Sequence, residues 1–190
     1  MKRRIFIAIN LPEKVKKRLK EYKERHDDLP VRWTKLPSLH LTLVFIGYVD
    51  NEQMLEACKI TREAAGEMES FPINFKRIIL GPIGKEPRMI WLEGAHSQEL
   101  NELKNKLEQA LISANAGLQK IDGKLFAPHI TLARIKTVDW RKLLVSDINS
   151  VEEKFEVQFN VNSIEVMESG LKFDGAEYAT LEECPLGEIN

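Results

Sequence analysis

Two short segments of the sequence repeat one pattern of side chains. The segments His40–Leu43 (HLTL) and His129–Leu132 (HITL) both consist of a histidine, an apolar residue, a threonine and another apolar residue. The chain holds four histidines, and chance rarely gives two of them the same following residues. Because imidazole changes its charge near neutral pH, a pair of histidines can act as acid and base on one substrate.

Each segment has the composition of a β-strand. Successive side chains of a strand point to opposite faces, so His40 and Thr42 should share one face while Leu41 enters the core. The same alternation applies to His129 and Thr131. The two segments lie about half a chain length apart. This spacing favours a duplicated architecture, in which each half brings one His–Thr strand to a common cleft.

Such a cleft suits phosphodiester chemistry without a metal. A neutral imidazole can take a proton from an attacking water, while a protonated one gives a proton to the leaving oxygen. The hydroxyls of Thr42 and Thr131 and the guanidinium of Arg134 can hold phosphate oxygens whose charge grows in the transition state.

Arg134 follows His129 at an odd spacing. In a regular strand its side chain would therefore point to the opposite face. Arg134 reaches the predicted cleft only if the strand bulges or ends near Ala133.

Other kinds of catalytic site fit the sequence less well. Cys58 and Cys184, the two cysteines of the chain, form neither a disulfide framework nor a cysteine-based zinc site, and neither is near a histidine in sequence. No carboxylate or thiol stands at ligand spacing beside either motif histidine, so we expect no metal and no other cofactor. His26 and His96 are expected to be surface or packing residues.

Helices alternate with strands along the chain, which predicts an α/β or α+β layered domain. Strands are expected near residues 4–9, 40–47, 73–80, 88–92, 129–134, 155–167 and 177–181, and a short segment at residues 31–33 precedes a loop. Helices are expected after Asn10 to about Arg25, after Asp50, after Ser97 and around residues 140–145. Asn10 is the expected cap of the first helix, with Pro12 and Glu13 in its first turn.

The composition is that of an ordinary globular protein. The length of 190 residues suits one domain, residues 1–190, made of two lobes. With 43% hydrophobic and 30% charged residues, the chain is not of the disordered class. The apolar run Ile5–Ile9 is too short for a signal peptide, and no stretch approaches the ~20 apolar residues of a membrane span. We therefore expect a soluble, cytoplasmic protein that does not bind a membrane.

The net charge of −1 is unevenly distributed. Residues 1–36 hold 12 Lys and Arg against 5 Asp and Glu, and the rest of the chain is acidic. A basic segment of this kind is either a solvated helix face or a surface that meets an anion. The near-neutral total disfavours a groove for long nucleic acid, which leaves a small anionic group or the end of an RNA.

The residues described above resemble a known family. The paired His-x-Thr-x motifs are similar to those of the two-histidine phosphoesterases, specifically the bacterial and archaeal RNA 2′,3′-cyclic phosphodiesterases called LigT-like. The resemblance includes the opening strand Arg4–Ile9, Trp33 with the block Leu39–Gly47, and the block Phe126–Arg134. It extends over residues 4–186, which is nearly the whole chain.

This resemblance implies a bilobal α+β fold, with two pseudo-symmetric lobes of antiparallel sheet flanked by helices around a central cleft, and with both termini in one lobe. It also implies hydrolysis of RNA 2′,3′-cyclic phosphates to 2′-phosphomonoesters. By the same resemblance, His40 donates a proton to the leaving 3′ oxygen and His129 accepts one from water. Thr42, Thr131 and Arg134 would contact the phosphate. The expected partners are RNA ends, including tRNA fragments, and the enzyme is expected to be a monomer.

Several alternatives share these residues. Family members also join a 2′,3′-cyclic phosphate to a 5′-hydroxyl, so an RNA ligase forming a 2′–5′ linkage is one alternative. A non-catalytic RNA-binding module is another, although it leaves the paired motifs unexplained. An RNA-cleaving nuclease and a phosphoesterase for a small cyclic nucleotide complete the set.

Overall fold

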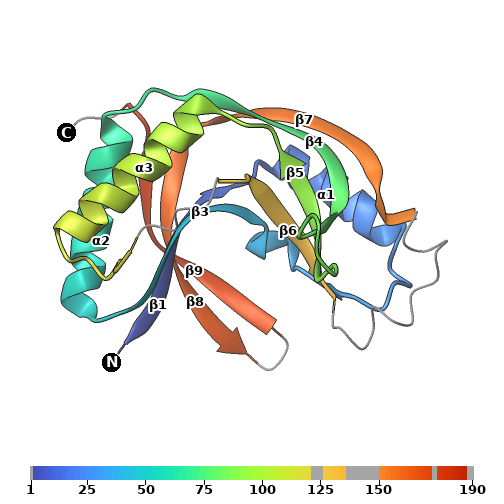
Figure 1. Ribbon diagram of the computed structural model, residues 1–190, viewed down its shortest axis with the longest axis horizontal. Coiled ribbons are helices and arrows are strands. Elements are labelled where there is room, and N and C mark those ends of the chain that lie inside the picture. Colours follow the sequence, from blue (N-terminus) through green and yellow to red (C-terminus); the bar gives the residue numbers. More distant parts are fainter. Residues whose placement is uncertain (1, 121–125, 136–149, 173–174, 188–190) are drawn as a thin grey trace.

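A computed structural model shows three α-helices, a short 3₁₀-helix (Leu36–Ser38) and one antiparallel sheet in the residues that it describes, which are 2–120, 126–135, 150–172 and 175–187 (Figure 1). The helices are α1 (Glu13–Glu24), α2 (Asn51–Gly66) and α3 (Gln98–Ser113). The strands are β1 (Arg3–Asn10), β2 (Arg32–Trp33), β3 (His40–Val49), β4 (Phe71–Gly81), β5 (Met89–Gly94), β6 (His129–Arg134), β7 (Glu153–Val161), β8 (Ser163–Lys172) and β9 (Gly175–Pro185). They follow the order β7-β4-β5-β6-β3-β1-β8-β9, and β2 pairs with β6.

The sheet divides into two halves of matching construction. β3, β1, β8 and β9 form the first half, β6, β5, β4 and β7 form the second, and β3 meets β6 at the centre. Helices α2 and α3 cover the first half (Figure 1). Helix α1 packs on the second half, where the guanidinium of Arg18 lies 4.4 Å above the ring of Phe155. The predicted α+β fold is confirmed, and the first and last strands lie in the same half.

Local sequence signals explain where two of the helices begin. Asp50 and Gln53 form a reciprocal capping box at the start of α2. At the start of α3, the Ser97 hydroxyl accepts a hydrogen bond of 3.2 Å from the amide of Leu100. None of the helices in the described ranges is long and apolar enough to cross a membrane.

Two details of the predicted fold were wrong. Helix α1 begins at Glu13 with Pro12 at its N-cap, because Asn10 still belongs to β1 and its side chain accepts from the amide of Leu11 at 2.9 Å. The run 155–167 contains the end of one strand and the start of the next, because the turn-forming Asn162 separates β7 from β8. The helix expected around residues 140–145 lies outside the described residues.

Candidate active site

The two motif segments lie on the two central strands of the sheet. β3 and β6 run antiparallel there, with Leu41 paired to Ile130. Both of these apolar side chains are buried, whereas both motif histidines and both motif threonines are partly exposed. Continuing the register by one residue in either direction places each histidine beside the threonine of the other motif. The structure therefore brings the four predicted side chains to one face of the sheet.

The two imidazoles are held by equivalent backbone contacts. Nδ1 of His40 lies 2.8 Å from the carbonyl oxygen of Ser38, and Nδ1 of His129 lies 2.9 Å from that of Ala127. A carbonyl oxygen only accepts a hydrogen bond, so Nδ1 carries the proton in each ring. Nε2 is consequently the nitrogen of each ring that can exchange a proton with a substrate.

The two Nε2 atoms differ in their contacts. Nε2 of His40 lies 3.0 Å from Oγ1 of Thr42, which donates to it when the ring is neutral. Within the described part of the chain, no side chain or backbone group forms a hydrogen bond with Nε2 of His129. His129 therefore presents an open basic nitrogen, while that of His40 is held by a neighbouring hydroxyl.

Burial lowers the pKa of both histidines below the ordinary value of 6.5. For His40, desolvation is the largest cause, and the positive charges of Arg134 and His129 lower its pKa further. The backbone hydrogen bond to Ser38 and the negative charge of Glu165 act in the opposite direction. Because Arg134 and His129 both act on His40, the three groups share one electrostatic environment.

A β-bulge turns Arg134 toward the histidine face. Met89 of β5 pairs with Arg134, whereas Trp91, two residues further along β5, pairs with Thr131, three residues back along β6. The extra residue in β6 shifts the alternation of side chains by one position, so Arg134 and Thr131 point to the same side. The bulge that the odd spacing from His129 requires is therefore present.

β3 contains a matching bulge. The register between β1 and β3 shifts between Ile7 and Ala8, so one extra β3 residue follows Thr42. The same change of alternation turns Phe45 to the histidine face, where it is 67% exposed. In the repeated segments HLTLVF and HITLAR, Phe45 therefore corresponds to Arg134.

Aromatic rings contact both histidines, and no pattern in the sequence indicated these contacts. Trp91 stacks on His129 with ring centroids 4.0 Å apart. Phe6 and Tyr178 each lie 4.9 Å from the ring of His40. These rings fix the orientation of the imidazoles and contribute to the burial that lowers their pKa values. They come from β5, β1 and β9, so their proximity to the motifs depends on strand pairing between distant segments.

The position of Trp91 depends on Gly81 of the neighbouring strand. A Cβ atom at position 81 would lie 2.3 Å from the indole ring, far inside van der Waals contact. No other residue type fits there unless Trp91 moves. The glycine at the end of β4 therefore makes room for the ring that supports His129.

The remaining candidate groups do not form a second catalytic site. Cys58 and Cys184 are buried free thiols, and burial raises their pKa values to about 11 and about 12, so neither supplies thiolate at neutral pH. His26 is buried and contacts two backbone carbonyls, and His96 is exposed. In the described ranges, no three His, Cys, Asp or Glu side chains gather as a metal site would require.

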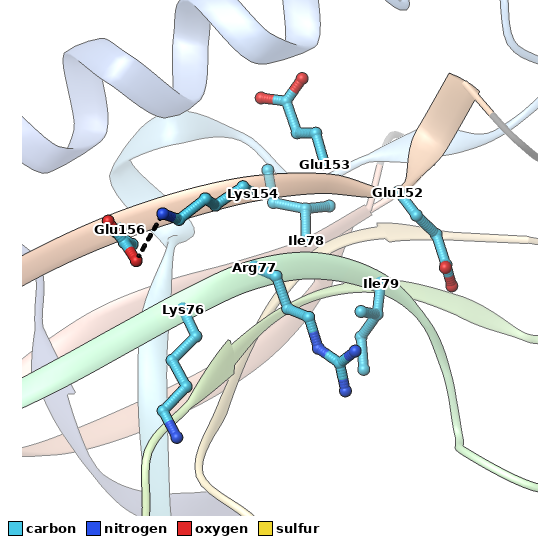
Figure 2. A pocket seen from close by; sticks show the side chains of 8 residues that line it. All are labelled: Lys76, Arg77, Ile78, Ile79, Glu152, Glu153, Lys154 and Glu156. Carbon is cyan, nitrogen blue, oxygen red and sulfur yellow. Dashed lines mark ion pairs between the residues drawn. The ribbon is translucent and has the colours of Figure 1, made fainter.

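A separate cavity of about 450 Å³ opens beside β4 and β7 (Figure 2). Residues 76–79 line one side of it, and residues 152–154 with Glu156 line the other. Lys154 pairs with Glu156 at 3.0 Å (Figure 2), and Arg77 pairs with Glu93 at 2.7 Å. The lining holds three cations and three carboxylates and none of the predicted site residues. It therefore has no net charge with which to attract a phosphate.

A known protein family matches nearly the whole chain. Its family model, described as LigT-like phosphoesterase, matches residues 9–91 and again residues 92–174. The chain belongs to the LigT-like phosphoesterase family. The first matched segment contains the His40 motif and the second contains the His129 motif. The predicted family and the predicted repeat of two lobes are thus confirmed.

Relatives of this LigT-like phosphoesterase are named for one reaction. The RNA 2′,3′-cyclic phosphodiesterase of Methanocaldococcus jannaschii is 27% identical over 182 residues, which cover 95% of this chain and 99% of that protein. The RNA 2′,3′-cyclic phosphodiesterase of Aquifex aeolicus is 32% identical over 161 residues, which cover 82% of each protein.

Solved structures share the LigT-like fold. A crystal structure of a Thermus thermophilus protein matches with a TM-score of 0.81 at 24% identity, covering 98% of this chain and 100% of that one. E. coli LigT complexed with 3′-AMP matches with a TM-score of 0.72 at 23% identity, covering 98% of this chain and 99% of that one. These likenesses confirm the predicted LigT-like fold.

Proposed function

We propose that the protein hydrolyses RNA 2′,3′-cyclic phosphate ends to 2′-phosphomonoesters, acting as a monomer in which residues 1–190 form one bilobal domain. The observation that carries this proposal is the pair of imidazoles on adjacent central strands, each with Nδ1 bonded to a backbone carbonyl and Nε2 left for proton transfer. The Methanocaldococcus and Aquifex relatives are named for this reaction. Both histidines come from one chain, so the site does not need a second copy.

The proposed reaction uses two proton transfers. Nε2 of His129 accepts a proton from a water molecule as the water oxygen attacks phosphorus. The protonated Nε2 of His40 donates its proton to the 3′ oxygen as the bond between phosphorus and that oxygen breaks, and the phosphate stays on the 2′ oxygen. Each positioned proton transfer typically contributes a rate factor of about 10²–10⁴. No metal ion or cofactor takes part in this proposal.

The groups around the histidines suit a nucleotide. Thr42, Thr131 and Arg134 offer hydroxyl and guanidinium donors to the phosphate oxygens, where negative charge grows in the transition state. Phe45 offers an exposed ring on the same face, and unpaired RNA bases stack on such rings. E. coli LigT, which shares this fold, has been crystallised with the nucleotide 3′-AMP.

The proposed substrates are RNA ends that carry the cyclic phosphate, including tRNA fragments, and the proposed location is the cytoplasm. The two cysteines are free thiols, which suits a reducing compartment.

A short RNA ending in a 2′,3′-cyclic phosphate, incubated with EDTA-treated protein, tests the proposed function. The expected product is RNA with a 2′-phosphate end, formed at the same rate with and without the chelator. Loss of turnover on chelation, or a 3′-phosphate product, would contradict the proposal. Added RNA with a 5′-hydroxyl would reveal a ligase by a longer product, and cleavage inside the chain would reveal a nuclease. RNA binding without turnover would indicate a binding module.

The rate should depend on pH with a maximum on the acidic side of neutrality. One imidazole must be charged and the other neutral, so kcat/KM should follow a bell-shaped curve. Burial lowers both pKa values below 6.5, so this curve should have its maximum below that pH and fall as the acid loses its proton at higher pH. Because bound phosphate favours the charged imidazole, kcat should persist to higher pH than kcat/KM. A kcat/KM maximum on the alkaline side would contradict this prediction.

A further inference from the structure

Glu165 of β8 is a buried carboxylate close to the candidate active site. Its side chain is 6% exposed, and the hydroxyl of Thr180 donates a hydrogen bond of 2.7 Å to it. No Lys or Arg in the described ranges forms an ion pair with Glu165. Burying a carboxylate with so few partners costs free energy unless a positive group nearby gains from its charge.

His40 is the group placed to gain from that charge. Ala8 of β1 pairs with Glu165 on one side and with Thr42 on the other. Since paired residues point to the same face, the carboxylate of Glu165 and the hydrogen bond between Thr42 and His40 lie on one face with Ala8 between them. The side chain of Ala8 is a single methyl group, so no larger side chain of β1 stands at this position between the carboxylate and the imidazole.

The surroundings of this pair strengthen their interaction. Phe6 belongs to a small buried cluster against which Tyr178 packs, and both rings also contact His40. Charges interact more strongly in such a poorly hydrated place than in water. In agreement, the negative charge of Glu165 raises the pKa of His40 against the larger effect of desolvation.

Among the residues that the structure describes, no carboxylate acts on His129 as Glu165 acts on His40. The neutral ring of Trp91 stacks on it. Glu93 is paired with His129 across the strands, but its carboxylate forms an ion pair with Arg77 at 2.7 Å. The pKa of His129 is set by burial and by its backbone hydrogen bond. The two repeats, so alike in their motifs, therefore differ in the charge placed near each histidine.

We propose that Glu165 is a positioning residue that favours the imidazolium form of His40 and so favours His40, rather than His129, as the proton donor. This inference rests on the proposed function. In the described part of the chain, the charged groups that act on His40 are Glu165 from β8 and Arg134 and His129 from β6. Of these, only Glu165 favours the charged form.

Two carboxylates on the same face of the sheet allow a matched comparison. Glu183 of β9 pairs with Glu165 across the strands, but it is exposed and its carboxylate accepts from the Ser163 hydroxyl at 3.1 Å. Glu165→Gln and Glu183→Gln each remove one negative charge on the same face. The first removes it from a buried site and the second from a hydrated one, where screening by water weakens its effect on His40.

The experiment is an NMR titration of the His40 imidazole together with the pH profile of kcat/KM. In E165Q, the pKa of His40 should fall by about 0.5–1 unit, and the alkaline limb of kcat/KM should move down by the same amount. At a fixed pH on that limb, the rate should fall about three- to tenfold, whereas the pH-corrected maximum should change little. E183Q should resemble wild type in both measurements.

The titration separates this inference from the proposed function, since it needs no turnover. An unchanged His40 titration in E165Q, or equal shifts in E165Q and E183Q, would overturn the role of Glu165 even in an active enzyme. Absence of wild-type turnover on the cyclic phosphate would overturn the proposed function through a different measurement. Should E165Q not fold, Glu165→Met removes the charge and fills the site with a side chain of similar length. A downward shift of the His40 pKa would then support the role, and an unchanged titration would overturn it.

Discussion

Replacing either His40 or His129 with alanine is expected to lower kcat/KM for a 2′,3′-cyclic phosphate RNA at least about 10²-fold. Each variant removes one of the two proton transfers in the proposed reaction. Both side chains are partly exposed on one face of the sheet, so their loss should open no cavity in the core. Steady-state kinetics on EDTA-treated protein, with thermal unfolding of each variant beside wild type, measure the two effects separately.

The double variant with alanine at both positions 40 and 129 tests whether the two histidines act together. Two residues that act as one unit are not additive, so loss of both should cost little more than the worse single loss. His96→Ala is the control, because His96 is exposed, belongs to neither motif, and has its ring 3.0 Å from the side chain of Asn101. A single variant with wild-type turnover would show that its histidine is not catalytic. Losses that multiply in the double variant would show that the two histidines act independently.

The common face of the motif side chains could be predicted from the sequence because alternation in a strand is a local property. His40 and Thr42 had to share a face whatever their strand paired with. That the two motif strands meet was also predictable, since the repeat implied two equivalent halves. The structure adds the pairing of Leu41 with Ile130, which puts both motifs on the same face.

The sequence predicted that Arg134 faces the histidines only if its strand bulges or ends near Ala133. A bulge depends on how a strand pairs with its neighbour, and the residues HITLAR alone do not determine how β5 pairs with β6. The register of Met89 and Trp91 against β6 supplies the missing information. Phe45, which corresponds to Arg134 in the other motif segment, was missed for the same reason. Aligning HLTLVF with HITLAR would have shown that the two residues occupy equivalent positions.

The sequence alone could not identify the residues on other strands that support the histidines. Trp91 and Gly81 meet only because β4 and β5 pair, and Glu165 reaches the His40 region only because β8 lies beside β1. The wrong helix cap has a more local cause. Asn10 and Pro12 are both residue types that suit a helix start. Because β1 stays paired with β3 as far as Asn10, the N-cap of α1 is Pro12.

Replacing Arg134 with alanine is expected to lower kcat/KM about 10²-fold, mainly through kcat. The guanidinium would meet phosphate oxygens whose charge is greatest in the transition state, so its loss weakens the transition state more than substrate binding. Arg134→Lys should recover only part of the rate, because an ammonium group cannot make the paired contacts of a planar guanidinium. Kinetics of both variants on the cyclic phosphate RNA measure these losses.

The pH profile and a matched arginine separate a phosphate contact from a general effect of charge. The charge of Arg134 lowers the pKa of His40, so Arg134→Ala should move the alkaline limb of kcat/KM to higher pH while reducing its maximum. Arg32 pairs with Arg134 across β2 and β6 and is likewise exposed, but, unlike Arg134, it is not among the charges that act on His40. Arg32→Ala removes the same charge without the proposed contact, so its loss should be much smaller. Equal losses in the two variants would mean that the positive charge of this face, and no specific contact of Arg134, supports the reaction.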